Sequence, residues 1–281
     1  MNDRLLFADR SERGKLRFTG EQRLWFLHQI LTQAFEDMAP GDARDAAFIT
    51  VHGRMKAFME CVTTDDALFM HFERELAETL PDEIRRYVFA TRVEIEDVTD
   101  PMGLVLISGE GWRELTSRCA PGSVLHPTAS LGLPAGYIWL ERSSVAAVIG
   151  ALGDAGATPG TEAELEEIRI SHGVPRWGRE MDEKTFPQEA GVDGRAVHYD
   201  KGCYVGQEAM AKIHFRGKVN RRLAVLAADR PLRPGTELNL GDVKIGTVTS
   251  AADRAALALV RYTIEAGTTV DAGGITATVA S

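Results

Sequence analysis

Residues 201–208 read KGCYVGQE, and the interpretation of the whole chain starts from this stretch. Cys203 lies between two glycines, so the backbone is free to bring its sulfur close to a ligand or a surface. Lys201 is two residues away, and a nearby cation favours the thiolate. Gln207 and Glu208 add an amide and a carboxylate of the kind that binds the edge of a polar heterocycle. The alternative is a tight turn around a buried, inert cysteine.

The surroundings of this stretch are basic. Between His198 and Arg222 the basic residues are Lys201, Lys212, Arg216, Lys218, Arg221 and Arg222. Only Asp200 and Glu208 oppose them, whereas the whole chain carries a net charge of -9. A basic island on an acidic protein indicates an anionic ligand or partner, and both a folate glutamate tail and an RNA phosphate fit. The alternative is a set of solvated charges at the edge of a barrel.

Upstream lies a long irregular stretch, residues 173–202, rich in Gly, Pro, Trp and charged residues. Long structured loops inside compact domains are often functional. Trp177 lies in this loop beside a proline and a glycine, where an aromatic ring could stack on a pterin, with core packing as the alternative.

Downstream, from residue 222, short apolar stretches alternate with Pro-Gly, Gly-Asp, Ala-Gly and Gly-Gly turns. This spacing predicts a small all-β barrel over residues 222–281, with the domain boundary near residue 221.

The N-terminal part reads as an α+β region over residues 1–221. Strands are expected at 16–19, 46–51, 59–62 and 67–72, and Thr19 with Gln22 resembles a capping box that opens a helix. From 67–72 onward the expected order is β-α-β-β-α-β, which resembles a ferredoxin-like unit over about 67–152. Thr161 and Glu164 form a second capping-box candidate.

Composition excludes several classes of protein. An acidic surface repels phosphate backbones, so no direct nucleic-acid binding is expected outside a basic patch. No apolar run is long enough to cross a bilayer, and the charged N-terminus lacks the apolar core of a signal peptide, which predicts a cytoplasmic protein without membrane contact. The three cysteines are widely spaced, and the seven histidines show no HxxxH or HExxH spacing, so no disulfide framework or metal site is expected.

The KGCYVGQE stretch resembles the signature of the YgfZ family, which is related to the glycine cleavage T-protein and to mitochondrial iron–sulfur assembly proteins. FPQEAG at 186–191 lies upstream at the family's usual distance, and HFRG at 214–217 lies downstream. ISHGVPRWG at 170–178 is similar to the family's glycine-proline turn. The FTGEQRLWFLHQILT segment and the HGRM near Gly53 resemble the T-protein-like folate domain, so the resemblance covers nearly the whole chain.

The resemblance implies a T-protein-like fold of three subdomains around a central opening that holds tetrahydrofolate or a one-carbon derivative. It further implies an accessory protein for iron–sulfur cluster assembly or repair, with iron–sulfur client or assembly proteins as partners. Effects on tRNA modification, implied for some family members, are then secondary to cluster supply. Cys203 would be the reactive thiolate, with Lys201 beside it. The residues expected to order the loop or contact folate are Gln188, Gln207, Glu208, Arg216, Tyr204 and Trp177.

The chain departs from aminomethyl-transferring T-proteins in one place. Where those proteins carry an acidic pair, residues 53–61 read GRMKAFMEC, with Lys56, Ala57 and Phe58 at the expected positions. Loss of this carboxylate removes the group that would manage the proton or charge of the reacting nitrogen, which argues against ordinary glycine cleavage. Two alternatives stay open: a folate-dependent aminomethyltransferase or demethylase, and a non-catalytic folate-binding module.

Overall fold

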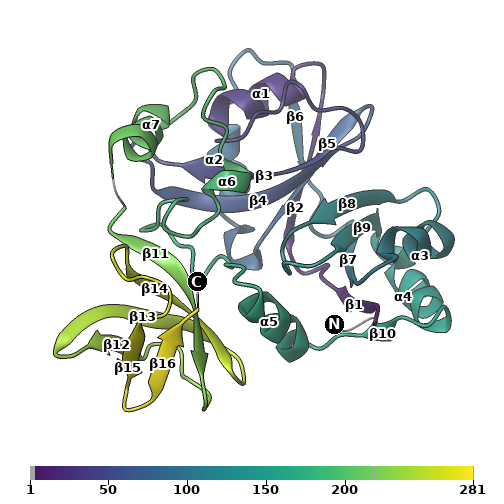
Figure 1. Ribbon diagram of the computed structural model, residues 1–281. Coiled ribbons are helices and arrows are strands. Elements are labelled where there is room, and N and C mark those ends of the chain that lie inside the picture. Colours follow the sequence, from purple (N-terminus) through teal and green to yellow (C-terminus); the bar gives the residue numbers. More distant parts are fainter. Residues whose placement is uncertain (1–3, 218, 281) are drawn as a thin grey trace.

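The computed structural model describes residues 4–217 and 219–280, with the side chain of Arg216 outside the described part. Within these ranges, the chain forms two five-stranded sheets and one closed six-stranded barrel. Figure 1 shows the sheets next to each other, with the barrel packed against them through helix α5. None of the helices in residues 4–217 and 219–280 is both long enough and apolar enough to span a membrane.

The first sheet is antiparallel, with the strand order β3-β4-β5-β2-β6. Its strands are β2 (Gly14–Thr19), β3 (Ala43–Ile49), β4 (Met55–Thr63), β5 (Ala67–Phe72) and β6 (Glu94–Asp97). The helical segments of this part are α1 (Arg23–Ile30), η1 (Arg74–Leu76) and α2 (Leu80–Arg85). Phe26 and Leu27 of α1 join the same buried cluster as Phe18 and Phe48 of the sheet. Each such side chain stabilises the fold by about 1.5–3 kcal/mol.

The second sheet has the strand order β10-β1-β7-β9-β8. Its strands are β1 (Leu6–Asp9), β7 (Met102–Ser108), β8 (Val124–Thr128), β9 (Ala135–Glu141) and β10 (Thr158–Pro159). Its helical segments are α3 (Trp112–Cys119), η2 (Arg142–Ser144) and α4 (Val145–Asp154).

A ferredoxin-like order, β-α-β-β-α-β, runs from β7 through α3, β8, β9 and α4 to β10. It starts and ends later than the range 67–152, because β5 and β6 pair with β2 in the first sheet rather than with β7 or β9. The apolar alternation that identifies a strand does not say which sheet the strand joins. Strand β8, which contains Pro127, and strand β1 were absent from the predicted elements.

The C-terminal barrel has the strand order β11-β14-β13-β12-β15-β16 and closes through pairing of β11 with β16. Its strands are β11 (Arg221–Ala228), β12 (Glu237–Leu240), β13 (Val243–Ala251), β14 (Ala255–Arg261), β15 (Thr269–Ala272) and β16 (Thr276–Val279). Inward-facing residues such as Leu226, Val248 and Val260 form one buried cluster. The predicted small barrel is confirmed, and a domain boundary at residues 221/222 stays our proposal.

Three helices connect the sheets to the barrel: α5 (Glu162–Ser171), α6 (Asp193–Ala196) and α7 (Gln207–Arg216). The predicted capping box at the start of α5 is confirmed, since the Thr161 hydroxyl accepts from the Glu164 amide and the Glu164 carboxylate accepts from the Thr161 amide. The box predicted from Thr19 and Gln22 is wrong. Helix α1 begins at Arg23, and its N-cap residue Gln22 makes no capping hydrogen bond through its side chain.

Candidate functional site

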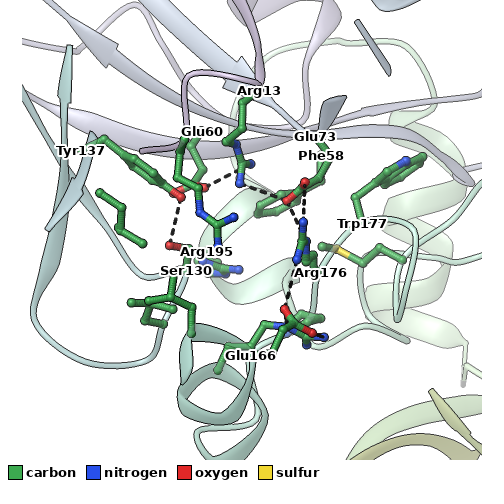
Figure 2. A pocket seen from close by; sticks show the side chains of 17 residues that line it. Arg13, Phe58, Glu60, Glu73, Ser130, Tyr137, Glu166, Arg176, Trp177 and Arg195 are labelled. Atoms are coloured by element: carbon green, nitrogen blue, oxygen red, sulfur yellow. Dashed lines mark hydrogen bonds and ion pairs between the residues drawn. The ribbon is translucent and has the colours of Figure 1, made fainter. Parts of the chain in front are cut away.

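A cavity rich in charged side chains lies between the two sheets, helix α5 and the segment 175–181 (Figure 2). Its volume is about 50 Å³. The charged residues of its wall are Arg10, Arg13, Arg169, Arg176, Arg195, Glu60, Glu73 and Glu166. They come from strands, helices and loops that are distant in sequence, so the wall forms only when these parts of the chain pack together.

Glu73, just after β5, links the first sheet to the segment after α5. Its Oε1 lies 3.0 Å from Arg13 Nη1 and 3.2 Å from Arg176 Nε. Burial acts to raise the pKa of Glu73, but the two guanidinium groups outweigh burial, and the net shift of this pKa is downward. Glu73 is therefore an anion at neutral pH. The two guanidinium groups that pair with it, those of Arg13 and Arg176, also line the cavity.

Arg176 carries the same network on to helix α5. Its Nη1 lies 2.6 Å from Glu162 Oε1 and 3.1 Å from Glu166 Oε1. Burial acts to lower the pKa of Arg176, but Glu73 and Glu162 outweigh it and keep the guanidinium charged. One side chain thus meets three carboxylates, so it can exchange one partner for another without losing all of its hydrogen bonds.

A fully buried ion pair joins the cavity to the barrel. Arg169 Nη1 lies 3.1 Å from Glu180 Oε2, and the side chains of both residues are at most 4% exposed. Arg169 Nη2 donates to Ser250 Oγ of β13 at 2.8 Å, and this hydroxyl donates to Glu180 Oε1 at 2.5 Å. Removing only one partner of such a buried pair strongly destabilises the fold, because the other charge stays buried without its counter-charge.

Apolar and aromatic groups complete the wall. Phe58 and Trp177 both line the cavity, and both also belong to the buried core cluster of the first sheet. The alternative of core packing for Trp177 is therefore confirmed, and its contact with folate stays a prediction. Phe58 stands at the position of the missing acidic pair, and Lys56 forms an ion pair with Glu83 instead of facing the cavity. Two residues after Phe58 on β4, Glu60 also lines the cavity, because alternate strand residues share a face. The cavity therefore keeps a carboxylate on this strand.

The Cys203 loop lies against the end of helix α1. Cys203 is exposed, whereas Lys201 is 7% exposed and its Nζ donates to backbone carbonyl oxygens. These acceptors are His28, Leu31 at 2.5 Å and Gln33 at 2.9 Å. Burial lowers the pKa of Lys201 to about 7. Three carbonyl oxygens at a helix C-terminus match the three donors of an ammonium group, so Lys201 anchors the loop to α1.

The rest of the motif supports the same loop. The Tyr204 ring is buried with its centroid 4.6 Å from Lys201 Nζ, and Gln207 Nε2 donates to the Lys201 carbonyl at 3.3 Å. Gly206 has φ +83°, and a Cβ there would come within 2.4 Å of the Thr50 carbonyl oxygen. Only glycine fits this close approach, which lets α7 begin directly after the loop.

Two further predicted residues have partners outside the cavity. Glu208 is exposed and pairs with Lys212 one turn along α7 at 2.7 Å. Gln188 Nε2 donates to the Tyr199 hydroxyl at 3.0 Å. The Arg216 side chain lies outside the described part of the structure, so its predicted contact with folate stays a prediction.

The basic island is partly neutralised by local acceptors. Arg221 Nη2 lies 3.0 Å from Glu189 Oε2, and Arg222 Nη2 donates to the Ile264 carbonyl at 2.9 Å. Lys218 lies outside the described residues. The island therefore contributes fewer free cations than its sequence indicates.

The predicted site residues fall into two places. Among those with described side chains, only Trp177 lines the central cavity, whereas Cys203 and its neighbours gather around α1 and α7. Sequence reasoning missed the cavity arginines, although Arg176 lies within the ISHGVPRWG stretch that resembles the family's glycine-proline turn. It also missed Glu60, for which the alternation of Phe58 and Glu60 along β4 was an available signal, because it puts both side chains on the same face.

Residues 220–281 match the family described as the CAF17 C-terminal beta-barrel domain. A putative chloroplastic transferase of Arabidopsis thaliana is 26% identical over 88% of this chain, and a mitochondrial iron-sulfur cluster assembly factor IBA57 homolog of Neosartorya fischeri is 25% identical over 82%. The chain matches 61% and 59% of the lengths of these two curated relatives.

The fold is that of a T-protein. The crystal structure of glycine cleavage system aminomethyltransferase T from Bartonella henselae superposes with a TM-score of 0.89, covering 99% of this chain and 85% of that chain at 16% identity. The expected α+β, T-protein-like fold with a ferredoxin-like subdomain and a C-terminal barrel is therefore confirmed.

Proposed function

We propose that this protein binds tetrahydrofolate or a one-carbon derivative and supports iron–sulfur cluster assembly or repair, as a protein of the YgfZ type. The observation that carries the proposal is the central cavity of arginines, glutamates and Trp177 inside a T-protein-like fold. The similarity to an iron-sulfur cluster assembly factor supports the assembly role. Iron–sulfur client or assembly proteins are the partners this role requires.

The chemistry of the cavity fits a folate. Guanidinium groups pair with the carboxylates of a glutamate tail, a carboxylate such as Glu60 accepts from pterin N–H groups, and Trp177 offers a stacking surface. The volume does not fit, because about 50 Å³ is far below the roughly 300–1,000 Å³ of ligand pockets. Folate binding therefore requires the Arg13–Glu73–Arg176 network to rearrange.

Cys203 supplies the reactive thiol in this proposal. It is the exposed cysteine, whereas Cys61 is buried and Cys119 is partly buried. Since Lys201 is held by carbonyl oxygens, we assign it the positioning of the loop rather than a direct role at the sulfur. The cytoplasmic location and the link to tRNA modification stay predictions.

Complementation in cells tests this function. Cells that lack the protein should recover the activity of an iron–sulfur enzyme when they express the wild-type chain or Cys119→Ser, but not when they express Cys203→Ala. Full recovery with Cys203→Ala would remove the reactive thiol and favour a non-catalytic folate-binding module. No recovery with the wild-type chain would contradict the assembly role itself.

Glu60 keeps a second function open, folate-dependent aminomethyl transfer or demethylation. It places a carboxylate in the cavity two residues after Phe58 and so supplies the group that the sequence alone indicated was missing. This function predicts methylenetetrahydrofolate formation from a methylated amine, with loss of the product in Glu60→Gln. Absence of product with the wild-type protein would exclude it.

A further inference from the structure

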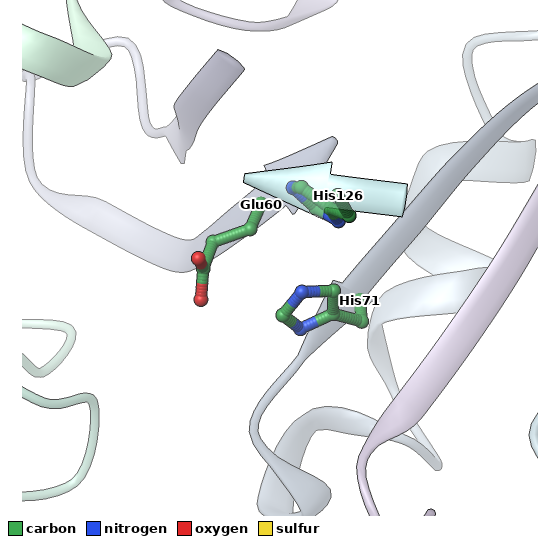
Figure 3. A group of neighbouring side chains, drawn as sticks. All are labelled: Glu60, His71 and His126. Atoms are coloured by element: carbon green, nitrogen blue, oxygen red, sulfur yellow. The ribbon is translucent and has the colours of Figure 1, made fainter. Parts of the chain in front are cut away.

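Two histidines and a glutamate from three different strands gather between the two sheets (Figure 3). Glu60 of β4 and His71 of β5 are directly opposed in register, and His126 comes from β8 of the second sheet. One potential ligand atom from each residue lies within 4.8 Å of the others. Their exposed fractions are 2%, 0% and 1%.

His71 is the feature that requires an explanation. Neither of its ring nitrogens has a hydrogen-bond partner among the described residues, although both nitrogens are buried. Aromatic rings surround it, with the Tyr137 ring centroid at 4.4 Å and the His126 ring centroid at 5.0 Å. Buried polar groups in native proteins are almost always satisfied, so an unpaired imidazole indicates a bound species that completes its contacts.

We propose that Glu60, His71 and His126 bind one divalent first-row transition-metal ion, such as Zn²⁺ or Fe²⁺, at the wall of the central cavity. Two imidazoles and one carboxylate form a ligand set that suits these ions and leaves positions for water or a cavity ligand. The inference does not rest on the proposed folate role, because it needs only the packing of the two sheets.

Charge and protonation support this assignment. Burial lowers the pKa of His126 to about 3 and, with Arg13, holds that of His71 well below its ordinary value, so both rings are neutral and keep a lone pair. The nearest cation, Arg13, is 3.0 Å from Glu73 but 3.8 Å from Glu60. The charge of Arg13 is therefore balanced mainly by Glu73. Glu60 Oε2 accepts a hydrogen bond from the Thr128 hydroxyl, so Glu60 Oε1 is the oxygen that we assign to the metal ion.

Access and geometry set two conditions. Glu60 also lines the central cavity, so the proposed metal site adjoins that cavity and the ion would enter from it. Metal–ligand bonds of about 2.0–2.2 Å require the three ligand atoms to move closer together than they are in this structure.

The His126 tautomer provides a second readout. Trp139 Nε1 donates to His126 Nδ1 at 3.3 Å, which places the ring proton on Nε2. A metal ion at Nε2 requires the opposite tautomer, so Trp139 must lose this acceptor. Metal binding should therefore change tryptophan emission.

The test is titration of the full chain, first stripped with a chelator, with Zn²⁺ by calorimetry and with Co²⁺ by absorption. We expect saturation at one equivalent, d–d bands from Co²⁺ and a change in tryptophan emission. His71→Gln removes no hydrogen bond, and Glu60→Gln is isosteric; each should weaken binding at least about 10-fold. His52→Ala, at an exposed histidine, is the matched control and should bind as the wild type does.

Thermal unfolding with and without Zn²⁺ separates a lost ligand from a lost fold. Metal should raise the Tm of the wild type and of His52→Ala but not that of His71→Gln. The proposal is overturned if the folded wild type shows no saturable binding of either ion. This is the result expected if a buried water molecule, rather than a metal ion, satisfies the His71 nitrogens. It is equally overturned if a folded His71→Gln binds both ions as tightly as the wild type.

Discussion

The central cavity and the Cys203 loop hold their cations in different ways. In the cavity, Arg176 meets the carboxylates of Glu73, Glu162 and Glu166, each of which can exchange for another anion. In the loop, Lys201 meets backbone carbonyl oxygens of His28 in α1 and of Leu31 and Gln33 directly after it, which belong to the main chain and cannot exchange for an anion. The first arrangement can reorganise around an anionic ligand, whereas the second fixes the loop so that Cys203 stays at the surface.

The largest effect is expected from the buried pair beside the cavity. Arg169→Met leaves the fully buried Glu180 carboxylate without its cation and should lower the free energy of unfolding by about 3–5 kcal/mol. Urea unfolding measures this loss. Arg179→Met, at an exposed neighbour, should stay within about 0.5 kcal/mol of the wild type. Equal stability of the two variants would show that the ion pair does not hold the cavity and the barrel together.

The loop anchor should have a smaller effect. Lys201→Met leaves the carbonyl oxygens at the end of α1 without a donor and should cost about 1–3 kcal/mol of unfolding free energy. Hydrogen exchange should also become faster in residues 201–208. Lys212→Met, on the exposed face of α7, is the control. Unchanged exchange in Lys201→Met would contradict the anchoring role.

Acid should destabilise the packing of the two sheets at a higher pH than the protonation of ordinary carboxylates would. His71 and His126 have lowered pKa values in the folded state, mainly through burial, so below about pH 6.5 the unfolded chain takes up protons that the folded chain does not. In the presence of a chelator, each histidine should therefore lower the free energy of unfolding by about 1.4 kcal/mol per pH unit as pH falls from about 6.5. Urea unfolding between pH 7 and 5 measures the slope, and His71→Gln should reduce it.

The smallest effect on stability is expected at the thiol itself. Cys203 is exposed, so Cys203→Ser should change the free energy of unfolding by no more than about 0.5 kcal/mol. In the native protein an alkylating reagent should modify Cys203 first, and Cys61 only after unfolding. Faster modification of Cys61 would contradict this comparison between exposed and buried sites.

Local elements of the fold were predictable, but their assembly was not. The strand at 67–72 has the bounds expected from its apolar pattern, and the barrel follows from its turn residues. The pairing of β5 with β2 depends on contacts that the periodicity of a strand does not encode. The range of the ferredoxin-like unit was misplaced for the same reason.

The candidate sites show the same limit. Cys203 was identifiable because its motif is contiguous in sequence. The network of Arg13, Glu73 and Arg176 was not, because tertiary packing alone brings these three residues together. The spacing rule for histidines likewise tested only near neighbours, whereas His71 and His126 meet across two sheets.

Calorimetric titration with tetrahydrofolate tests the central claim most directly, using the wild type, Cys203→Ala, Arg176→Gln and the exposed control Arg179→Gln. If folate binds in the cavity and Cys203 acts at a separate place, the wild type, Cys203→Ala and Arg179→Gln should bind with equal affinity. Arg176→Gln should bind about 10-fold or more weakly, because it loses charge-assisted hydrogen bonds. No saturable binding by the wild type, or binding lost in Cys203→Ala and kept in Arg176→Gln, would contradict the account.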